Sequence, residues 1–180
     1  LNPLDDPQVA ANPGNRCYYC KRHIFTAIIQ AAREEGFHLL LDGTNASDRV
    51  DDRPGMQALR ELEVLSPLRL CGLTKAEIRR RSREAGLFTW DKPAYACLAT
   101  RIPTGTAITL EDLQRTERCE AFLMELGFSG FRLRLMDGCA RLEIPEAQFP
   151  MLLAHREAVL ERLKKDYTRV LLDLEARHEQ

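Results

Sequence analysis

The chain has 180 residues, of which 44% are hydrophobic and 29% are charged, a composition typical of a folded globular protein. The 26 Lys and Arg residues are balanced by 27 Asp and Glu residues, so no excess of positive charge supports binding to nucleic acid. No apolar run approaches the roughly 20 residues that span a bilayer, and residues 1–16 lack the pattern of a secretory signal. We therefore expect a cytoplasmic protein with reduced cysteines and with neither a membrane nor a nucleic-acid partner.

The first half of the chain alternates predicted helices and predicted buried strands after a loop at residues 1–16. The expected order is a helix at 22–35, a buried strand at 37–41, a helix at 54–63, a buried strand at 67–70, and a helix that Thr74 caps and Gly86 ends. This alternation is typical of an α/β domain with a parallel sheet, but such sheets normally have more than two strands. We therefore expect residues 1–90 to be part of a larger α/β domain.

The second half follows a different pattern, after a linker at 91–108 that is rich in Pro, Gly and small residues. The expected order is a helix at 110–126, a hairpin at 131–144 that turns at Asp137-Gly138, a helix at 151–165 and a strand at 167–174. This order predicts a small α+β domain over 109–180, with its helices on one face of an antiparallel sheet.

The predicted hairpin carries a candidate anion site. Alternate residues of a strand face the same side, so Arg132 and Arg134 should share a face about 6.5 Å apart along the strand. Arg141 and Glu143 lie on the polar face of the partner strand. Guanidinium groups arranged in this way suit phosphate or carboxylate. The alternative interpretation of the same pattern is a solvated sheet face with surface ion pairs and no ligand.

Cysteines supply two further candidates. Cys97 stands between Lys92 and Arg101, whose charges could favour the reactive thiolate, although a buried structural cysteine is the alternative. Cys17 and Cys20 form a Cys-x-x-Cys just before the first predicted helix, a spacing that serves a redox pair, half a zinc site, or two ligands of an iron–sulfur cluster. The remaining cysteines are Cys71 and Cys119, which we expect to pack, and Cys139 at the turn.

A polar loop follows the first predicted strand, at the strand end where open α/β sheets bind ligands. Its small and acidic residues could line a nucleotide and its magnesium ion, or form an ordinary polar connection. These residues are Asp42, Gly43, Thr44, Asn45, Asp48, Asp51 and Asp52.

Several segments occur in a fixed order along nearly the whole chain: Arg16-Cys17-Tyr18-Tyr19-Cys20-Lys21, Asp42-Gly43-Thr44-Asn45, Arg53-Pro54-Gly55, Leu73-Thr74-Lys75, Lys92-Pro93, Cys97-Leu98-Ala99-Thr100-Arg101, Arg132-x-Arg134 and Ala140 to Ile144. In this order they resemble the PP-loop ATP pyrophosphatases and, more closely, the LarE family of ATP-dependent sulfur transferases. The resemblance implies a partial parallel-sheet PP-loop (HUP-like) α/β domain, followed by a small α+β domain. The family's Ser-Gly-Gly-x-Asp-Ser phosphate loop is not found here, and we expect an N-terminal segment to be absent from these 180 residues.

The resemblance also implies a reaction. ATP, with Mg²⁺, would adenylylate the carboxylate of a pyridinium mononucleotide, a precursor of the nickel-pincer cofactor of lactate racemase. Cys97 would attack the acyl-adenylate and then lose its sulfur to the product, which leaves dehydroalanine in the protein.

The same resemblance assigns roles to residues. The substrate phosphate would be held by Arg132 and Arg134, with Arg101 and Thr100 nearby, where the family often has Ser in place of Thr100. Glu143 would orient the arginines or assist proton transfer. The nucleotide side would be lined by Tyr18, Gly43, Asn45 and Asp48.

Two alternatives remain open, and the family is often oligomeric, so a homo-oligomer is a further expectation. A variant of the family carries sulfur on a [4Fe–4S] cluster, for which Cys17, Cys20 and Cys97 could supply the ligands. A PP-loop synthetase with nitrogen chemistry would use the same nucleotide site without a reactive Cys97.

Overall fold

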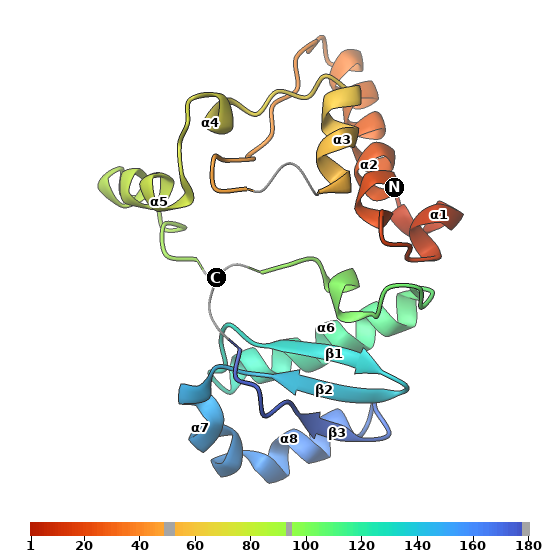
Figure 1. The fold of residues 1–180 in the computed structure, drawn as a ribbon, viewed down its shortest axis with the longest axis vertical. Coiled ribbons are helices and arrows are strands. Elements are labelled where there is room, and N and C mark those ends of the chain that lie inside the picture. Colours follow the sequence, from red (N-terminus) through yellow and green to blue (C-terminus); the bar gives the residue numbers. More distant parts are fainter. Residues whose placement is uncertain (49–52, 93–94, 178–180) are drawn as a thin grey trace. The chain divides into compact units, whose positions relative to one another are not determined.

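The protein consists of two compact units, residues 1–92 and residues 93–180 (Figure 1). The computed structural model describes residues 1–48, 53–92 and 95–177. Asp51 and Asp52 of the predicted polar loop lie outside the described residues. Both helices and strands are present, and no helix in the described ranges is long and apolar enough to cross a membrane.

The first unit is mainly helical. Residues 1–16, expected to be a loop, instead form a short 3₁₀ turn and a short helix, each with a proline in its first turn and an Asn or Asp cap. The helical segments of this unit are η1 (Pro3–Asp5), α1 (Pro7–Ala10), α2 (Arg16–Glu34), α3 (Pro54–Glu61), α4 (Pro67–Leu70) and α5 (Lys75–Glu84). Three predicted helices are therefore confirmed, although α2 begins earlier than expected. Thr74 caps α5 by accepting a hydrogen bond from the Glu77 backbone N–H at 3.3 Å.

Packing of α2 against α3 forms the small core of the first unit. Met56, Leu59 and Val64 are buried there, with Phe25, Leu40 and Leu62 packed against them. Gly55 allows the two helices to approach closely, since a Cβ at this position would lie 3.0 Å from Lys21 Cδ and 3.5 Å from the Cys17 carbonyl oxygen.

The strand predicted at 37–41 is wrong. Only one parallel bridge forms there, between Leu41 and Leu65, with an N–H···O bond of 2.8 Å from Asp42 to Leu65. Phe37 is 67% exposed, so its apolar side chain is not in a core. A strand is stable only when neighbouring strands and a packed face support it, and the described residues supply no more than this bridge.

The strand predicted at 67–70 is also wrong, because these residues form the single helical turn α4. Pro67 has a φ angle suited to the first helical position, and an apolar run of this length does not by itself distinguish a strand from a helical turn. Cys71, expected to pack at the end of that strand, is exposed.

The second unit contains a three-stranded sheet. Its hairpin joins β1 (Arg132–Met136) to β2 (Cys139–Glu143) in antiparallel register, as expected. The remaining elements of the unit are η2 (Leu98–Arg101), α6 (Leu110–Glu125), η3 (Glu146–Gln148), α7 (Phe149–Ala154), α8 (Arg156–Leu163) and β3 (Val170–Leu172). The helix predicted at 151–165 is thus divided at His155, whose backbone leaves the helical region at φ −99° and ψ 11°.

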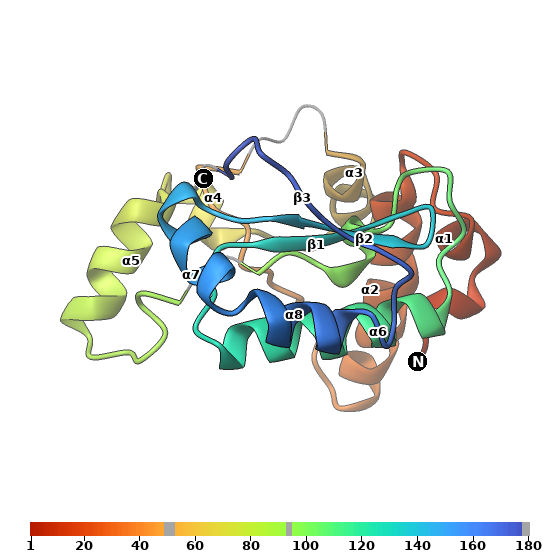
Figure 2. The same cartoon turned by 90° about the horizontal axis from the view of Figure 1, so that it is seen from below.

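The third strand corrects the predicted antiparallel sheet. β3 pairs with β2 in parallel, so the sheet is mixed and has the order β1-β2-β3. The chain crosses over through α7 and α8 between β2 and β3, and such a crossover brings a strand back in the same direction. Figure 2 shows α6 and α8 on the same side of this sheet, as the prediction of a one-sided helical layer requires.

The sheet and its helices enclose a core much larger than that of the first unit. Alternate residues of β1 and β2 face inward, so the apolar members are buried and the charged members lie on the opposite face. The buried apolar residues of this unit are Ile102, Ile108, Cys119, Leu123, Phe128, Phe131, Leu133, Leu135, Ala140, Leu142, Ile144, Val159, Leu163 and Tyr167.

Candidate active site

A buried carboxylate anchors the segment that contains Cys97. Glu120 of α6 is fully buried and accepts two hydrogen bonds from Arg101, at 2.7 and 2.9 Å. It also accepts the Tyr95 hydroxyl at 2.7 Å and the backbone N–H of Leu133 at 3.1 Å. Since Tyr95 and Arg101 stand on either side of Cys97 in the chain, Glu120 fixes this segment to β1 at both ends.

Arg101 is therefore placed differently from the other predicted phosphate-binding residues. Its side chain has no solvent exposure and forms an ion pair with Glu120. Its Nη1 donates to Thr100 Oγ1 at 2.9 Å, and Thr100 Oγ1 donates to the Cys97 carbonyl oxygen at 2.7 Å. These bonds hold the tight turn η2, and Cys97, the residue directly before it, is exposed.

Four of the predicted residues line one pocket of about 390 Å³ on the second unit, namely Thr100, Arg101, Arg134 and Glu143. Arg141, a member of the predicted arginine patch, also lines it. Cys97 and Arg132 are not among its lining residues. The pocket lies where η2 meets the polar face of the hairpin.

One carboxylate holds the two arginines of this pocket. Glu143 Oε1 accepts Arg134 Nε at 2.5 Å and Arg141 Nη2 at 2.9 Å. Arg134 Nη1 also donates to the Thr100 carbonyl oxygen at 2.8 Å, which links β1 to η2. The remaining arginine donors can bind a ligand anion, and the guanidinium group is well suited to phosphate.

Arg132 differs from these residues because its side chain is buried and forms no ion pair within the described ranges. It is 8% exposed, its Nη1 donates to the Phe131 carbonyl oxygen at 2.7 Å, and it pairs with no carboxylate of the described ranges. Burial, followed by the positive charges of Arg101, Arg177 and Arg134, lowers the pKa of Arg132. Arg132 and Arg134 nonetheless share a strand face, as predicted, because their cross-strand partners are Glu143 and Arg141.

The cysteines of the second unit have contrasting surroundings. Cys97 is exposed, whereas Cys119 is fully buried in α6, as expected for a packing residue. Burial raises the pKa of the Cys119 thiol to about 12, and the nearby Asp166 adds to this effect. Cys139 is partly buried, with Sγ at 3.7 Å from Thr168 Oγ1.

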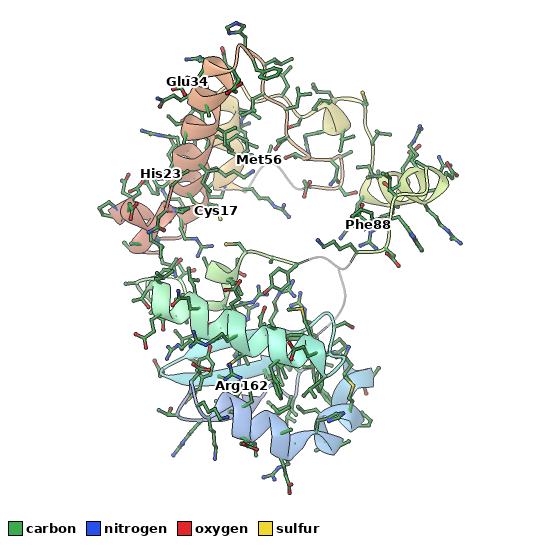
Figure 3. The ribbon with its side chains drawn as sticks, turned by 180° about the vertical axis from the view of Figure 1, so that it is seen from behind. Cys17, His23, Glu34, Met56, Phe88 and Arg162 are labelled. Carbon is green, nitrogen blue, oxygen red and sulfur yellow. The ribbon has the colours of Figure 1, made fainter. Side chains whose placement is uncertain are left out.

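In the first unit, the Cys-x-x-Cys lies inside α2 and not before it. Figure 3 shows Cys17 on this helix, one turn from Cys20 in sequence. Tyr18, between them, donates its hydroxyl to Glu61 Oε2 at 2.6 Å and so ties α2 to α3. This hydrogen bond also lowers the pKa of Glu61. Within the described ranges, no three His, Cys, Asp or Glu side chains gather as a metal site.

The polar loop after Leu41 is held by its own carboxylates. Asp42 accepts Thr44 Oγ1 at 2.5 Å and Ser66 Oγ at 2.6 Å. Burial, the largest influence, favours its protonated form, but these hydrogen bonds outweigh burial and lower the pKa of Asp42.

The other predicted nucleotide residues lie in the same loop. Asp48 Oδ2 accepts the Asn45 N–H at 3.0 Å, and Asp48 Oδ1 pairs with Arg53 at 3.0 Å. Gly43 has open space around its Cα, since a Cβ at this position would have no neighbouring atom within 4 Å. The carboxylates of Asp42 and Asp48 are thus both engaged inside the protein.

Glu120 is the residue of this site that sequence reasoning missed. The spacing of residues in this helix indicates that Glu120 is buried. One buried helix face is formed by Thr116, Cys119, Glu120 and Leu123. A glutamate on such a face requires a buried partner. The sequence alone does not say that this partner is Arg101.

Comparison with known proteins gives three relatives, while no protein-family model matches the chain. An uncharacterized protein of Synechocystis is 42% identical over 147 residues, which cover 82% of this chain and 55% of that protein. The pyridinium-3,5-bisthiocarboxylic acid mononucleotide synthase of Lactiplantibacillus plantarum is 31% identical over 175 residues, which cover 97% of this chain and 63% of that protein. An uncharacterized protein of Methanocaldococcus jannaschii is 28% identical over 176 residues, which cover 97% of this chain and 69% of that protein. The chain thus spans between about half and about two thirds of the length of these relatives.

Proposed function

We propose that this chain is part of an ATP-dependent sulfur transferase of the LarE family that acts in cofactor biosynthesis. The observation that carries the proposal is the 31% identity to the pyridinium-3,5-bisthiocarboxylic acid mononucleotide synthase across 97% of this chain. The exposed thiol of Cys97, on a turn joined to an arginine-lined pocket, is consistent with transfer of sulfur to an anionic substrate.

The proposed reaction has three steps. A substrate carboxylate oxygen attacks the α-phosphorus of ATP and releases pyrophosphate, so that the acyl carbon gains AMP as its leaving group. The Cys97 thiolate attacks this carbon, which forms a thioester and releases AMP. A base then removes the Cα proton of Cys97, the Cβ–S bond breaks, and the substrate leaves as a thiocarboxylate while dehydroalanine remains in the chain.

The residues of the second unit would bind and orient the substrate. Arg132 and Arg134 would hold its phosphate, and Glu143 would keep Arg134 and Arg141 in place. Arg101 would act indirectly: paired with Glu120, it fixes the turn that presents Cys97 and Thr100.

The part of the site that binds the nucleotide would be lined by Tyr18, Gly43, Asn45 and Asp48. We assign no magnesium ligand to this loop, since the carboxylates of Asp42 and Asp48 are already hydrogen-bonded within the protein.

Mass spectrometry tests the proposal. The full-length protein is incubated with ATP, magnesium and the pyridinium carboxylate mononucleotide, and its intact mass and peptides are then measured. We expect loss of the elements of H₂S at Cys97 alone, with Cys139 of the same unit unchanged. Cys97→Ala should abolish the product, whereas Cys139→Ala should not.

The other results separate the alternatives. Product formed with Cys97 intact, and with iron and sulfide bound, would indicate the cluster-carrier route. Activity retained by Cys97→Ala would exclude both sulfur routes and would favour a synthetase with nitrogen chemistry.

A further inference from the structure

One arginine holds the backbone of the polar loop at residues 42–48. Arg69 Nη1 donates to the carbonyl oxygen of Asn45 at 3.3 Å and to that of Asp48 at 2.8 Å. The Asp48 N–H donates to the same Asn45 carbonyl at 3.2 Å, so a single guanidinium nitrogen fixes both ends of this turn. Because the guanidinium is charged, its hydrogen bonds are stronger than those between neutral groups.

Arg69 belongs to α4, the helical turn found where a strand was expected. Ser66, directly before this turn, donates its hydroxyl to Asp42 Oδ1 at 2.6 Å. Residues three apart share one face of a helix but lie on opposite faces of a strand. The helical turn therefore lets Ser66 and Arg69 reach the same loop, which a strand over 67–70 would not allow.

The segment after α4 attaches the loop independently of Arg69. The Ala46 N–H donates to the Leu73 carbonyl oxygen at 2.8 Å, and the Lys75 N–H donates to Ser47 Oγ at 3.0 Å. Without Arg69 the loop would thus stay attached, but the turn at its end would lose the bonds that orient it. We expect such a change to alter the shape of the loop while the fold of the unit remains.

We propose that Arg69 is a positioning residue of the nucleotide site, and that α4 holds the loop at 42–48 in the shape that binds ATP. The inference rests on the function proposed above, under which this loop lines the nucleotide. Arg69 acts through the backbone of Asn45 and Asp48 and not by contact with ATP. A loop that is already ordered binds its ligand at a lower entropic cost. The effect of Arg69 is therefore on ATP affinity, and not on the later attack by Cys97.

Two measurements on the full-length protein test this separation. Calorimetry gives the affinity for α,β-methylene-ATP, which cannot release pyrophosphate, and mass spectrometry gives the single-turnover rate of sulfur loss at saturating ATP. Arg69→Gln should weaken binding of the analogue about tenfold, the size of one charge-assisted hydrogen bond, and should leave the saturated rate within about twofold. Arg69→Lys should restore most of the affinity, because an ammonium group can also donate to both carbonyl oxygens.

Further variants separate positioning from general damage. Arg33→Gln, which removes an exposed arginine of α2, is the matched control and should bind the analogue as the wild type does. Ser66→Ala removes the other contact of α4 with the loop and should weaken binding about threefold, as expected for a neutral hydrogen bond. Arg69 lies outside the core of Met56, Leu59 and Val64, so the unfolding midpoint of Arg69→Gln should stay within about 3 °C of the wild type.

Three results would overturn the inference. Unchanged affinity in Arg69→Gln would show that the loop binds the nucleotide without help from α4. Weaker binding together with a large fall in the unfolding midpoint, and without recovery in Arg69→Lys, would show a purely structural role. In both cases the mass change at Cys97 still supports the proposed sulfur transfer. A wild-type protein that binds no analogue and loses no sulfur would refute the proposed function, and the inference with it.

Discussion

Glu120, in the immediate surroundings of the Cys97 segment, is fully buried and accepts four hydrogen bonds. The two hydrogen bonds from Arg101, the one from Tyr95 and the one from the Leu133 backbone satisfy a carboxylate that would otherwise be very costly to bury. Burial and the hydrogen bond to Glu120 also raise the pKa of Tyr95 to about 12, so its hydroxyl remains a donor at neutral pH. The chain on both sides of Cys97 is thus held by one residue.

Removing the Glu120 charge should therefore destabilise the protein strongly. We expect Glu120→Gln to cost about 3–5 kcal/mol in free energy of unfolding, because Arg101 would remain buried and charged without its partner. Urea denaturation measures the change. Glu125→Gln, an exposed position of the same helix, should change stability by less than about 0.5 kcal/mol. Equal effects of the two substitutions would show that the buried pair contributes no special stability.

The thiols should differ in reactivity according to their exposure. Iodoacetamide reacts with the thiolate, and a pKa of about 12 leaves about one Cys119 molecule in 10⁴ ionised at pH 8. We expect peptide mapping at pH 8 to find Cys97 alkylated and Cys119 unmodified in the folded protein. Both should be modified in urea. Alkylation of folded Cys119 at the rate of Cys97 would contradict the buried position of α6.

The position of a single residue can be predicted from the sequence where the geometry of its own strand or helix determines it. The shared face of Arg132 and Arg134 follows from strand alternation alone, and the register confirms it. The burial of Arg101 could not be predicted in the same way, because its partner Glu120 is 19 residues away and meets it through the tertiary packing of α6 against η2.

At the scale of elements, the turn between β1 and β2 is the feature that its own sequence, Asp137-Gly138, predicts most directly. Asp137 and Gly138 both have positive φ angles, 48° and 76°, as a two-residue hairpin turn of type I′ requires. This backbone conformation is unfavourable for most residues with a side chain. The turn sets the register that places the arginines and Glu143 on one face.

Gly138→Ala should consequently destabilise the hairpin. We expect a cost of about 1 kcal/mol in free energy of unfolding from the positive φ, measured by urea denaturation. Steric crowding should add little to this cost, since the nearest atom to the new Cβ would be Thr168 Oγ1 at 3.8 Å. Gly14→Ala, at a glycine without positive φ and with open space around it, should be neutral or slightly stabilising. A neutral Gly138→Ala would mean that the turn can adopt another conformation.

The elements predicted wrongly depend on partners that lie outside the local sequence. Residues 37–41 have the apolar run of a buried strand, yet in the described ranges they obtain only the bridge to Leu65. The parallel direction of β3 depends on the crossover through α7 and α8, and not on the residues of β3. A clear cap, as at α5, or apolar residues at helical spacing, as in α6, is a local feature from which the helix can be predicted.

At the scale of the whole molecule, the two units differ greatly in their own cores. The first unit buries Val9, Met56, Ala58, Leu59 and Val64, while Phe37, Leu39, Leu41 and Phe88 are exposed. The second unit has a sheet with helices packed on it and a larger buried apolar set. Since burial of apolar surface is the main source of stability, the units should differ in their ability to fold alone.

We therefore expect residues 93–180, expressed separately, to unfold in one cooperative urea transition and to bind inorganic phosphate with the affinity that we expect of the whole chain. All residues that we propose to bind the substrate phosphate, and the Arg101–Glu120 pair, belong to this unit. Residues 1–92, expressed in the same way, should unfold with low cooperativity and should bind a dye that reports exposed apolar surface. Circular dichroism and dye fluorescence measure both fragments. Loss of structure in 93–180 would show that this sheet requires the first unit, and that the Cys97 segment and the arginine-lined pocket depend on both.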